Sequence, residues 1–290
     1  MPAKTGIAFA VVTATGGHYA TVQAAEDAGE LSIHVRAGQS VAGWNQNSAG
    51  VEVELGPGVT VTSGINISGN NCSLIGGPGC TIQGEIDVTT GVEAFIEFMN
   101  GGTLQNIDIN TARCYVNGGG WGTVAEGNTN NQNAIDGDGS ATSFICENLG
   151  AFTTVGQAAD KGPVNLVGAS SILRLCKVTA TDSFGDIVLR GANSCGIGCI
   201  SLTASVTFGV ALSNAAGIKL IGSYSAAATY GAYLEVDAVG QDMVVVGNVL
   251  NGNVFIDAML NSIVVGNRID TTITDNGTNS TTAANDLTAF

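Results

Sequence analysis

Acidic side chains recur at a fixed spacing in two parts of this chain. Asp87 and Asp108 are separated by a spacing of 21, with Asn66 one such step before them, and Glu235 and Asp257 are separated by a spacing of 22. Two carboxylates about 5 Å apart can cleave a glycosidic bond with retention, one as nucleophile and the other as acid and base. The four acidic residues are therefore candidate catalytic residues if the fold stacks them on neighbouring elements.

A tandem repeat supplies elements that would stack these side chains. The last residue of a short apolar run recurs in each repeat, and we call these equivalent residues a column. Successive members of the column are 23, 23, 22 and 22 positions apart. A period near 22 with short β-branched runs and Gly or Asn turns is typical of a β-solenoid. Alternate residues of a strand face opposite sides, so one face of the column is predicted to be interior. The interior residues are Leu166, Leu189, Leu212, Leu234 and Ile256.

An earlier block, from about residue 33 to 110, repeats with a period of 21. Three apolar columns follow this period, which indicates three sheets. The columns are Ile33, Val53, Leu74 and Phe95; Ile65, Ile86 and Ile107; and Val61, Ile82 and Leu104.

The repeats predict an all-β fold, a right-handed single-stranded parallel β-helix. Residues 1–38 are interpreted as a lead-in with a short capping helix that covers the N-terminal end of the rod. The β-helix is predicted over 39–273, with a glycine- and asparagine-rich insertion at about 111–139. Residues 274–290 are predicted to form a C-terminal tail or cap.

Composition limits the possible partners. The chain has 290 residues, of which 24 are acidic and 9 basic, with a net charge of −15. This charge argues against nucleic acid or an anionic membrane as a partner. The chain contains no run of 18 apolar residues, so we expect no transmembrane helix. The first residues lack the charged segment of a signal peptide, so we expect none.

Seven cysteines form no CxxC motif. Cys176 and Cys199 are separated by a spacing of 23, the same as the first steps of the leucine column, so we expect them to stack on successive coils. Buried reduced thiols explain this pattern better than a metal site. We therefore predict no metal and no cofactor, and assembly in a reducing cytoplasm.

The entry into the repeats carries a family resemblance. Residues 19–25, Tyr-Ala-Thr-Val-Gln-Ala-Ala, and 33–38, Ile-His-Val-Arg-Ala-Gly, resemble the entry into pectate-lyase-like β-helices, including bacteriophage tailspikes. The resemblance implies a virion protein that is assembled in the host cytoplasm beside capsid or tail proteins. It would be a homotrimeric capsid decoration (cement) protein, or a short tailspike or adhesin that binds host surface glycan. Aromatic rings can stack on sugars, so the predicted ligand-binding residues are Trp121, Tyr115 and Trp44.

A polysaccharide-degrading enzyme, a glycoside hydrolase or a lyase, is the alternative on this scaffold. Polygalacturonase-like enzymes combine Asn-x-Asp, an adjacent Asp-Asp pair, Gly-His-Gly and Arg-x-Lys, and only Asn106-Ile107-Asp108 matches this set. Both histidines, His18 and His34, lie in the entry segment. The sequence therefore favours a protein without catalytic activity, and the four carboxylates above remain its only catalytic candidates.

A second column, one residue before each interior leucine, is apolar and is placed on the exterior by alternation. Runs such as 243–246 and 263–265 are apolar on both faces, as in strands buried on both sides. An exposed apolar stripe implies a partner, and we expect second copies of the chain in a homotrimer. Cover by a loop or by the C-terminal tail is the alternative. The predicted interface residues are Val188, Ala211, Tyr233, Phe255, Val245 and Val264.

Overall fold

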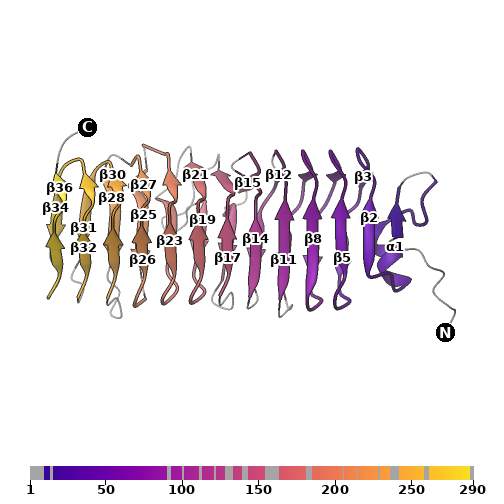
Figure 1. The fold of residues 1–290 in the computed structure, drawn as a ribbon, viewed down its shortest axis with the longest axis horizontal. Helices are drawn as coiled ribbons and strands as arrows, with labels where there is room; N and C mark the ends of the chain where they lie inside the picture. The colour runs from indigo at the N-terminus through magenta and orange to yellow at the C-terminus, as the bar shows by residue number, and fades with distance from the viewer. Residues whose placement is uncertain are drawn as a thin grey trace.

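The protein forms a rod of stacked β-coils that runs from the N-terminus at one end to the C-terminus at the other (Figure 1). The computed structural model describes residues 10–13, 16–89, 93–99, 101–110, 113–120, 122–127, 133–138, 143–153, 163–180, 185–204, 206–213, 215–227, 229–235, 242–257 and 261–287. Within these ranges the strands form three sheets, and all their pairings are parallel. The predicted parallel β-solenoid is confirmed, while its handedness stays a prediction.

The 13-stranded sheet is called sheet A here and the 11-stranded sheet is called sheet C. Sheet A contains β1 (Ala10–Val12), β2 (Ser32–Val35), β5 (Glu52–Leu55), β8 (Cys72–Gly76), β11 (Ala94–Phe98), β14 (Cys114–Asn117), β17 (Ile145–Glu147), β20 (Ile172–Arg174), β23 (Cys195–Ile197), β26 (Lys219–Ile221), β29 (Val244–Val246), β32 (Ile263–Val265) and β35 (Thr281–Ala283). Sheet C contains β4 (Asn45–Gln46), β7 (Ile65–Ile67), β10 (Ile86–Val88), β13 (Ile107–Ile109), β16 (Ile135–Gly137), β19 (Val164–Leu166), β22 (Gly185–Leu189), β25 (Phe208–Ser213), β28 (Tyr230–Glu235), β31 (Asn253–Ile256) and β34 (Ile273–Asp275).

The third sheet, sheet B, has 12 strands, most of them very short. It contains β3 (Ser40–Val41), β6 (Thr60–Val61), β9 (Thr81–Ile82), β12 (Thr103–Leu104), β15 (Val124–Gly127), β18 (Gly150–Thr153), β21 (Lys177–Ala180), β24 (Ile200–Ser201), β27 (Tyr224–Ser225), β30 (Val249–Leu250), β33 (Arg268–Ile269) and β36 (Asp286–Leu287). Each coil therefore passes through sheets A, B and C in turn.

The interior is lined by the predicted columns. The leucine column is confirmed, since strand pairing aligns Leu166 through Ile256 in sheet C and every member is fully buried. The columns that begin at Ile65 and Val61 are also confirmed.

One predicted column is wrong at its last member. Leu74 pairs with Ile96, whereas Phe95 pairs with Ser73 and is 37% exposed. The step from Leu74 to Ile96 is one position longer than the step from Val53 to Leu74. Because side chains alternate along a strand, this single extra residue moves Phe95 to the outer face.

The only helix in the described ranges is α1 (Val22–Asp27), at the N-terminal end of the rod (Figure 1). The hydroxyl of Thr21 accepts a hydrogen bond from Ala24 N, which caps the first turn. Val22 and Ala25 are buried in the main core. The short helix predicted within residues 1–38 is present, and its role as a cap stays a prediction. No helix of the described residues is long and apolar enough to cross a membrane.

The stretch at 111–139 is described in part by the structure. It contributes β14, β15 and β16, one strand to each sheet, and each pairs with the coils on both sides. The coil from Asp108 to Asp136 is longer than the coil before it, and residues 128–132 lie outside the described residues, so the insertion stays a prediction. Gly119 and Gly120, which lie between β14 and β15, have positive φ, as tight turns require.

The C-terminal segment continues the solenoid. Within 274–287, β35 and β36 extend sheets A and B, and most of their side chains are exposed. The segment is therefore a last coil at the end of the rod rather than a loose tail.

The cysteines follow the prediction. Ile200 N donates a hydrogen bond to Cys176 O over 2.8 Å, which places Cys176 and Cys199 on successive coils. All seven cysteines are free thiols, and all except Cys195 are buried. Burial raises the pKa of the Cys114 thiol to about 12, so this group stays protonated at neutral pH.

Candidate functional site

One exterior column of sheet C contains two groups of predicted residues. They are the carboxylates Asp87 and Asp108 and the interface residues Val188, Ala211, Tyr233 and Phe255. The N-terminal half of the column is polar and its C-terminal half is apolar, and the change falls between β19 and β22. From the N-terminal end the column is Asn45, Asn66, Asp87, Asp108, Asp136, Asn165, Val188, Ala211, Tyr233, Phe255 and Thr274.

Three aspartates on neighbouring strands form the carboxylate ladder: Asp87, Asp108 and Asp136. Asparagine side chains donate hydrogen bonds to the aspartates at its two ends, Asp87 and Asp136. Asn110 donates to Asp87 Oδ1 over 3.3 Å, and Asp136 accepts from Asn133 over 2.9 Å and from Asn165 over 3.0 Å. Asp136 was not predicted because the coil that joins it to Asp108 is longer than the period of the preceding block. Its Ile-Asp-Gly context, which repeats Ile-Asp-Ile at 107–109, would have revealed it.

The middle carboxyl of the ladder is the most perturbed. Burial, followed by the charges of Asp136, Glu85 and Asp87, raises the pKa of Asp108 to about 6, against the opposing hydrogen bond from Asn110. Burial also raises the pKa of Asp87. Asp108 can therefore keep its proton up to about pH 6. Among the described residues, no group of three His, Cys, Asp or Glu side chains has the arrangement of a metal site.

The second predicted carboxylate pair lies in register on sheet C. β25 and β28 pair Ser213 with Glu235, and Asp257 N donates to Leu234 O over 3.0 Å. Glu235 and Asp257 therefore occupy neighbouring coils. The side chain of Glu235 lies outside the described residues, so the distance between the two carboxyl groups stays a prediction.

The apolar half of the sheet C column carries an aromatic cluster that consists of Phe208, Tyr230, Tyr233 and Phe255. The ring centroids of Phe208 and Tyr233 are 4.4 Å apart, and those of Tyr233 and Phe255 are 5.3 Å apart. Phe208 and Tyr230 lie on the same strands as predicted interface residues, but they were missed because only one exterior position per strand was considered.

The aromatic cluster corrects part of the predicted interface. Val188 and Ala211 pack with Phe208 in a separate apolar cluster and are only 3% and 5% exposed. A single chain therefore covers them, and they are not available to a partner. Tyr233 and Phe255 are half-buried and stay candidates for the interface.

Two more predicted interface residues are wrong. Val245 and Val264 pair with each other in the inner column of sheet A and have no exposed surface. The runs 243–246 and 263–265 are apolar on both faces, as predicted, but Val245 and Val264 point into the rod. Their neighbours point outward and belong to the aliphatic face, defined here as Ile172, Cys195, Ile197, Ile221, Val244, Val246, Ile263 and Val265.

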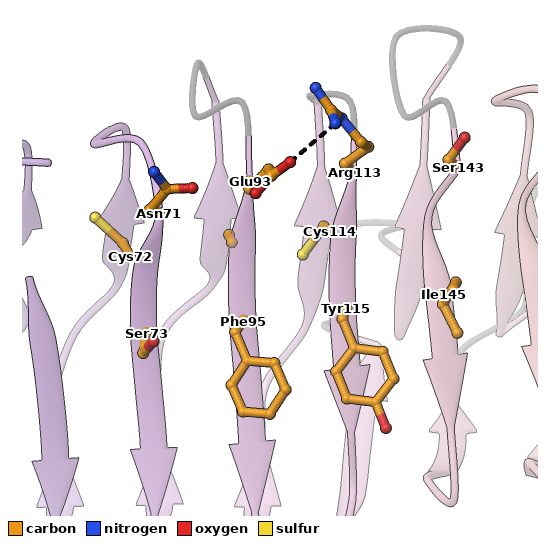
Figure 2. Close-up of a pocket in the computed structure, with 11 residues that line it drawn as sticks. Asn71, Cys72, Ser73, Glu93, Phe95, Arg113, Cys114, Tyr115, Ser143 and Ile145 are labelled. Atoms are coloured by element: carbon orange, nitrogen blue, oxygen red, sulfur yellow. Dashed lines mark ion pairs between the residues drawn. The ribbon is translucent and has the colours of Figure 1, made fainter. Parts of the chain in front are cut away.

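N-terminal to the aliphatic face, sheet A carries a groove of about 550 Å³ (Figure 2). Strands β8, β11, β14 and β17 form its floor, and the predicted ligand-binding residue Tyr115 lines it. Of the other two aromatic candidates, Trp44 is buried in the main core and is only 4% exposed, so it cannot stack on a ligand. Trp121 lies outside the described residues.

A charged network fixes one wall of the groove. The Tyr115 hydroxyl donates to Glu147, and Arg174 Nε donates to Glu147 Oε2 over 2.6 Å. Burial opposes ionisation of Glu147, but the contacts with Tyr115 and Arg174 outweigh it, so the pKa of Glu147 is lowered. Burial and the bond to Glu147 raise the pKa of Tyr115 to about 12. Tyr115 is therefore a neutral donor held in one orientation.

Comparison of the chain with protein-family models, curated proteins and solved structures finds no match. The resemblance to pectate-lyase-like and tailspike proteins therefore stays a prediction, and function is inferred from the faces described above.

Proposed function

We propose that this protein is a structural and adhesive component of a bacteriophage virion that works as a homotrimer of β-solenoid rods. It would serve as a capsid decoration (cement) protein, or as a short tailspike or adhesin that contacts host polysaccharide. It would be assembled in the host cytoplasm beside capsid or tail proteins. The observation that carries this proposal is the aliphatic face of sheet A.

The aliphatic face extends over the neighbouring strands β20, β23, β26, β29 and β32. Ile221 is 37% exposed and Ile263 is 40% exposed. Removing such aliphatic surface from water is favourable by roughly 25 cal/mol per Å². An apolar face that extends over five strands therefore favours a binding partner.

Charge supports a second copy of the chain as that partner. The chain carries a net charge of −15, so two copies repel each other over most of their surface. The outward positions of the five sheet A strands β20, β23, β26, β29 and β32 carry no carboxylate, and the charged residues among them are Arg174 and Lys219. Symmetric copies can bring this face together around a common axis, and a threefold axis is the arrangement that the tailspike resemblance implies.

The assembly is tested by sedimentation. We expect the natural chain to sediment as three copies of 29.1 kDa, and the double variant Ile221→Glu, Ile263→Glu to sediment as one copy. Buried carboxylates facing one another at the axis would oppose association. As a control, Leu202→Glu changes an exposed apolar residue away from this face and should leave the trimer intact. A natural chain that sediments as a single copy would contradict the trimer.

A polysaccharide-degrading glycoside hydrolase or lyase is a second candidate, favoured by the raised pKa of Asp108 between Asp87 and Asp136. A carboxyl that stays protonated up to about pH 6 can donate a proton to a leaving group. We expect no release of reducing ends from host capsule, consistent with a structural protein. Turnover that Asp108→Asn lowers at least 100-fold, while Glu126→Gln on sheet B does not, would replace the structural proposal with the enzyme. The same assay on Asp257→Asn would test the second pair.

A further inference from the structure

We propose that the groove on sheet A is a binding site for a neutral oligosaccharide that lies along the rod axis. This inference rests on the proposed adhesive function and assigns it to residues that the sequence did not suggest, above all Phe95, Glu93 and Arg113. The groove crosses neighbouring strands of the sheet, so its length follows the axis of the rod.

One wall of the groove is an aromatic pair on neighbouring strands. Phe95 and Tyr115 stack with ring centroids 5.2 Å apart and planes within 12° of each other. Figure 2 shows the two rings side by side, with Ser73 and Ile145 at the same level on the outer strands. Because Ser73 is small, the face of Phe95 that points toward it is left open. An open aromatic face attracts the apolar C–H face of a pyranose ring.

The other wall is polar and is formed by the turns that precede the strands. Asn71, Glu93, Arg113 and Ser143 line this side, and Glu93 pairs with Arg113 over 2.9 Å (Figure 2). Asn71, Arg113 and Ser143 have left-handed backbones, with φ of 55°, 59° and 62°. This backbone conformation recurs before three of the four strands, and with Glu93 before β11 it sets polar groups in a row opposite the aromatic wall. An amphipathic sugar needs this combination of an apolar face and hydrogen-bonding groups.

The length and rigidity of the groove suit a short sugar chain. Its four strands span three strand spacings, roughly 14 Å, which is the length of two or three linked sugar rings. The bond from Tyr115 to Glu147 and the Arg174 contact hold the aromatic wall before a ligand arrives. A wall that is ordered in advance loses little conformational entropy on binding.

The charges around the groove favour a neutral ligand over an acidic one. Among the described residues that line it, Arg113 is the only cation, and its guanidinium is already paired with the Glu93 carboxylate. Glu52 and Glu54 on the next strand toward the N-terminus add negative charge to the same face of sheet A. An acidic sugar would therefore meet net repulsion.

Binding is tested on a printed array that carries neutral hexose oligosaccharides and their uronate- or sialate-containing counterparts. We expect the full chain to bind neutral members of the array in a saturable manner. Phe95→Ala should weaken binding at least tenfold because it removes the open aromatic face. Ser73→Tyr should weaken it to the same extent by filling that face while leaving Phe95 in place. Met99→Ala, an exposed apolar residue just after the same strand, is the matched control and should bind normally.

Several outcomes would overturn the site: no binding to any neutral glycan, binding to acidic glycans only, or unchanged binding by both Phe95→Ala and Ser73→Tyr. Sedimentation of the same preparations separates this inference from the proposed trimer. A monomer that binds neutral glycan through Phe95 keeps the groove and contradicts the trimer. A trimer that ignores neutral glycans keeps the assembly and contradicts the groove.

Discussion

Asn267→Ala is expected to lower the free energy of unfolding by about 3 kcal/mol or more. Asn267 is 1% exposed and lies at the corner between sheets A and B. It belongs to an internal polar ladder that consists of Ser223, Asn248, Asn267 and Asn285. Its Oδ1 accepts from both the backbone N and the Nδ2 of Asn248, each over 2.9 Å. Its Nδ2 donates to Val245 O over 2.9 Å and to Asn285 Oδ1 over 3.0 Å.

The size of this effect follows from the number of groups left without partners. Alanine removes the acceptor of two Asn248 donors and the donor to Val245 O, all of them shielded from water. A buried donor or acceptor that loses its partner costs about 1 to 3 kcal/mol. The ladder continues through Ser223 N, which donates to Asn248 Oδ1 over 2.7 Å, so the loss also weakens the preceding coil.

Urea unfolding and native-state hydrogen exchange measure the effect. Since neighbouring coils of a solenoid stabilise one another locally, we expect exchange to accelerate first in β29, β30, β32 and β33. Asn276→Ala, on an exposed turn of the last coil, is the matched control and should change stability by less than about 0.5 kcal/mol. A loss below about 1 kcal/mol for Asn267→Ala would contradict a structural role for the ladder.

The second large effect concerns pH. Asp186 on β22 is fully buried and accepts hydrogen bonds at Oδ2 from Ser201 Oγ over 2.6 Å and from Thr203 N over 3.2 Å. Its Oδ1 has no hydrogen-bond partner among the described residues. Burial, opposed by these hydrogen bonds, raises the pKa of Asp186 to about 6 from an ordinary value of 3.8.

The direction of the pH effect follows from proton uptake. Between about pH 4 and pH 6 the folded chain holds a proton on Asp186 that the unfolded chain has released. The contribution of Asp186 to stability is therefore most favourable below about pH 4, falls as the pH rises from about 4 to about 6, and stays lower above that range. A pKa difference of about 2 corresponds to about 3 kcal/mol at neutral pH. Asp108, whose pKa is also raised to about 6, acts in the same direction.

Asp186→Asn should abolish its part of this dependence, because the amide keeps an acceptor for Ser201 and Thr203 and carries no charge. We expect the variant to be more stable than the natural chain at pH 7.5 and close to it at pH 4, in urea titrations at the two pH values. Asp257→Asn, on the exterior, is the control and should leave the slope unchanged. Because Asp108 contributes its own part of the pH dependence, the slope should become shallower without vanishing, and a slope as steep as that of the natural chain would contradict a buried ionised carboxylate at Asp186.

The period of the sequence was enough to predict the architecture. A solenoid repeats one environment per coil, so the leucines of 166–256 recur at the length of a coil and reveal both the stacking and the interior face. The carboxylates at 87 and 108 were aligned by the same rule. These features depend on spacing alone, and spacing is visible in a single sequence.

Other features needed the tertiary structure. A coil one residue longer than its neighbours turned Phe95 outward, and this change created the aromatic wall of the groove. In the runs around Val245 and Val264 both faces are apolar, so alternation gave two equivalent registers, and only packing decided which one points inward.

The candidate sites depended on the structure most strongly. Asp136 joined the carboxylate ladder across a coil of irregular length, and Phe208 covered Val188 and Ala211 from the same sheet face. The sequence by itself thus determined the rod and its interior, because every coil buries the same column. Only the tertiary structure decided what each outer face presents, because exposure depends on side chains from neighbouring coils whose register varies with each turn.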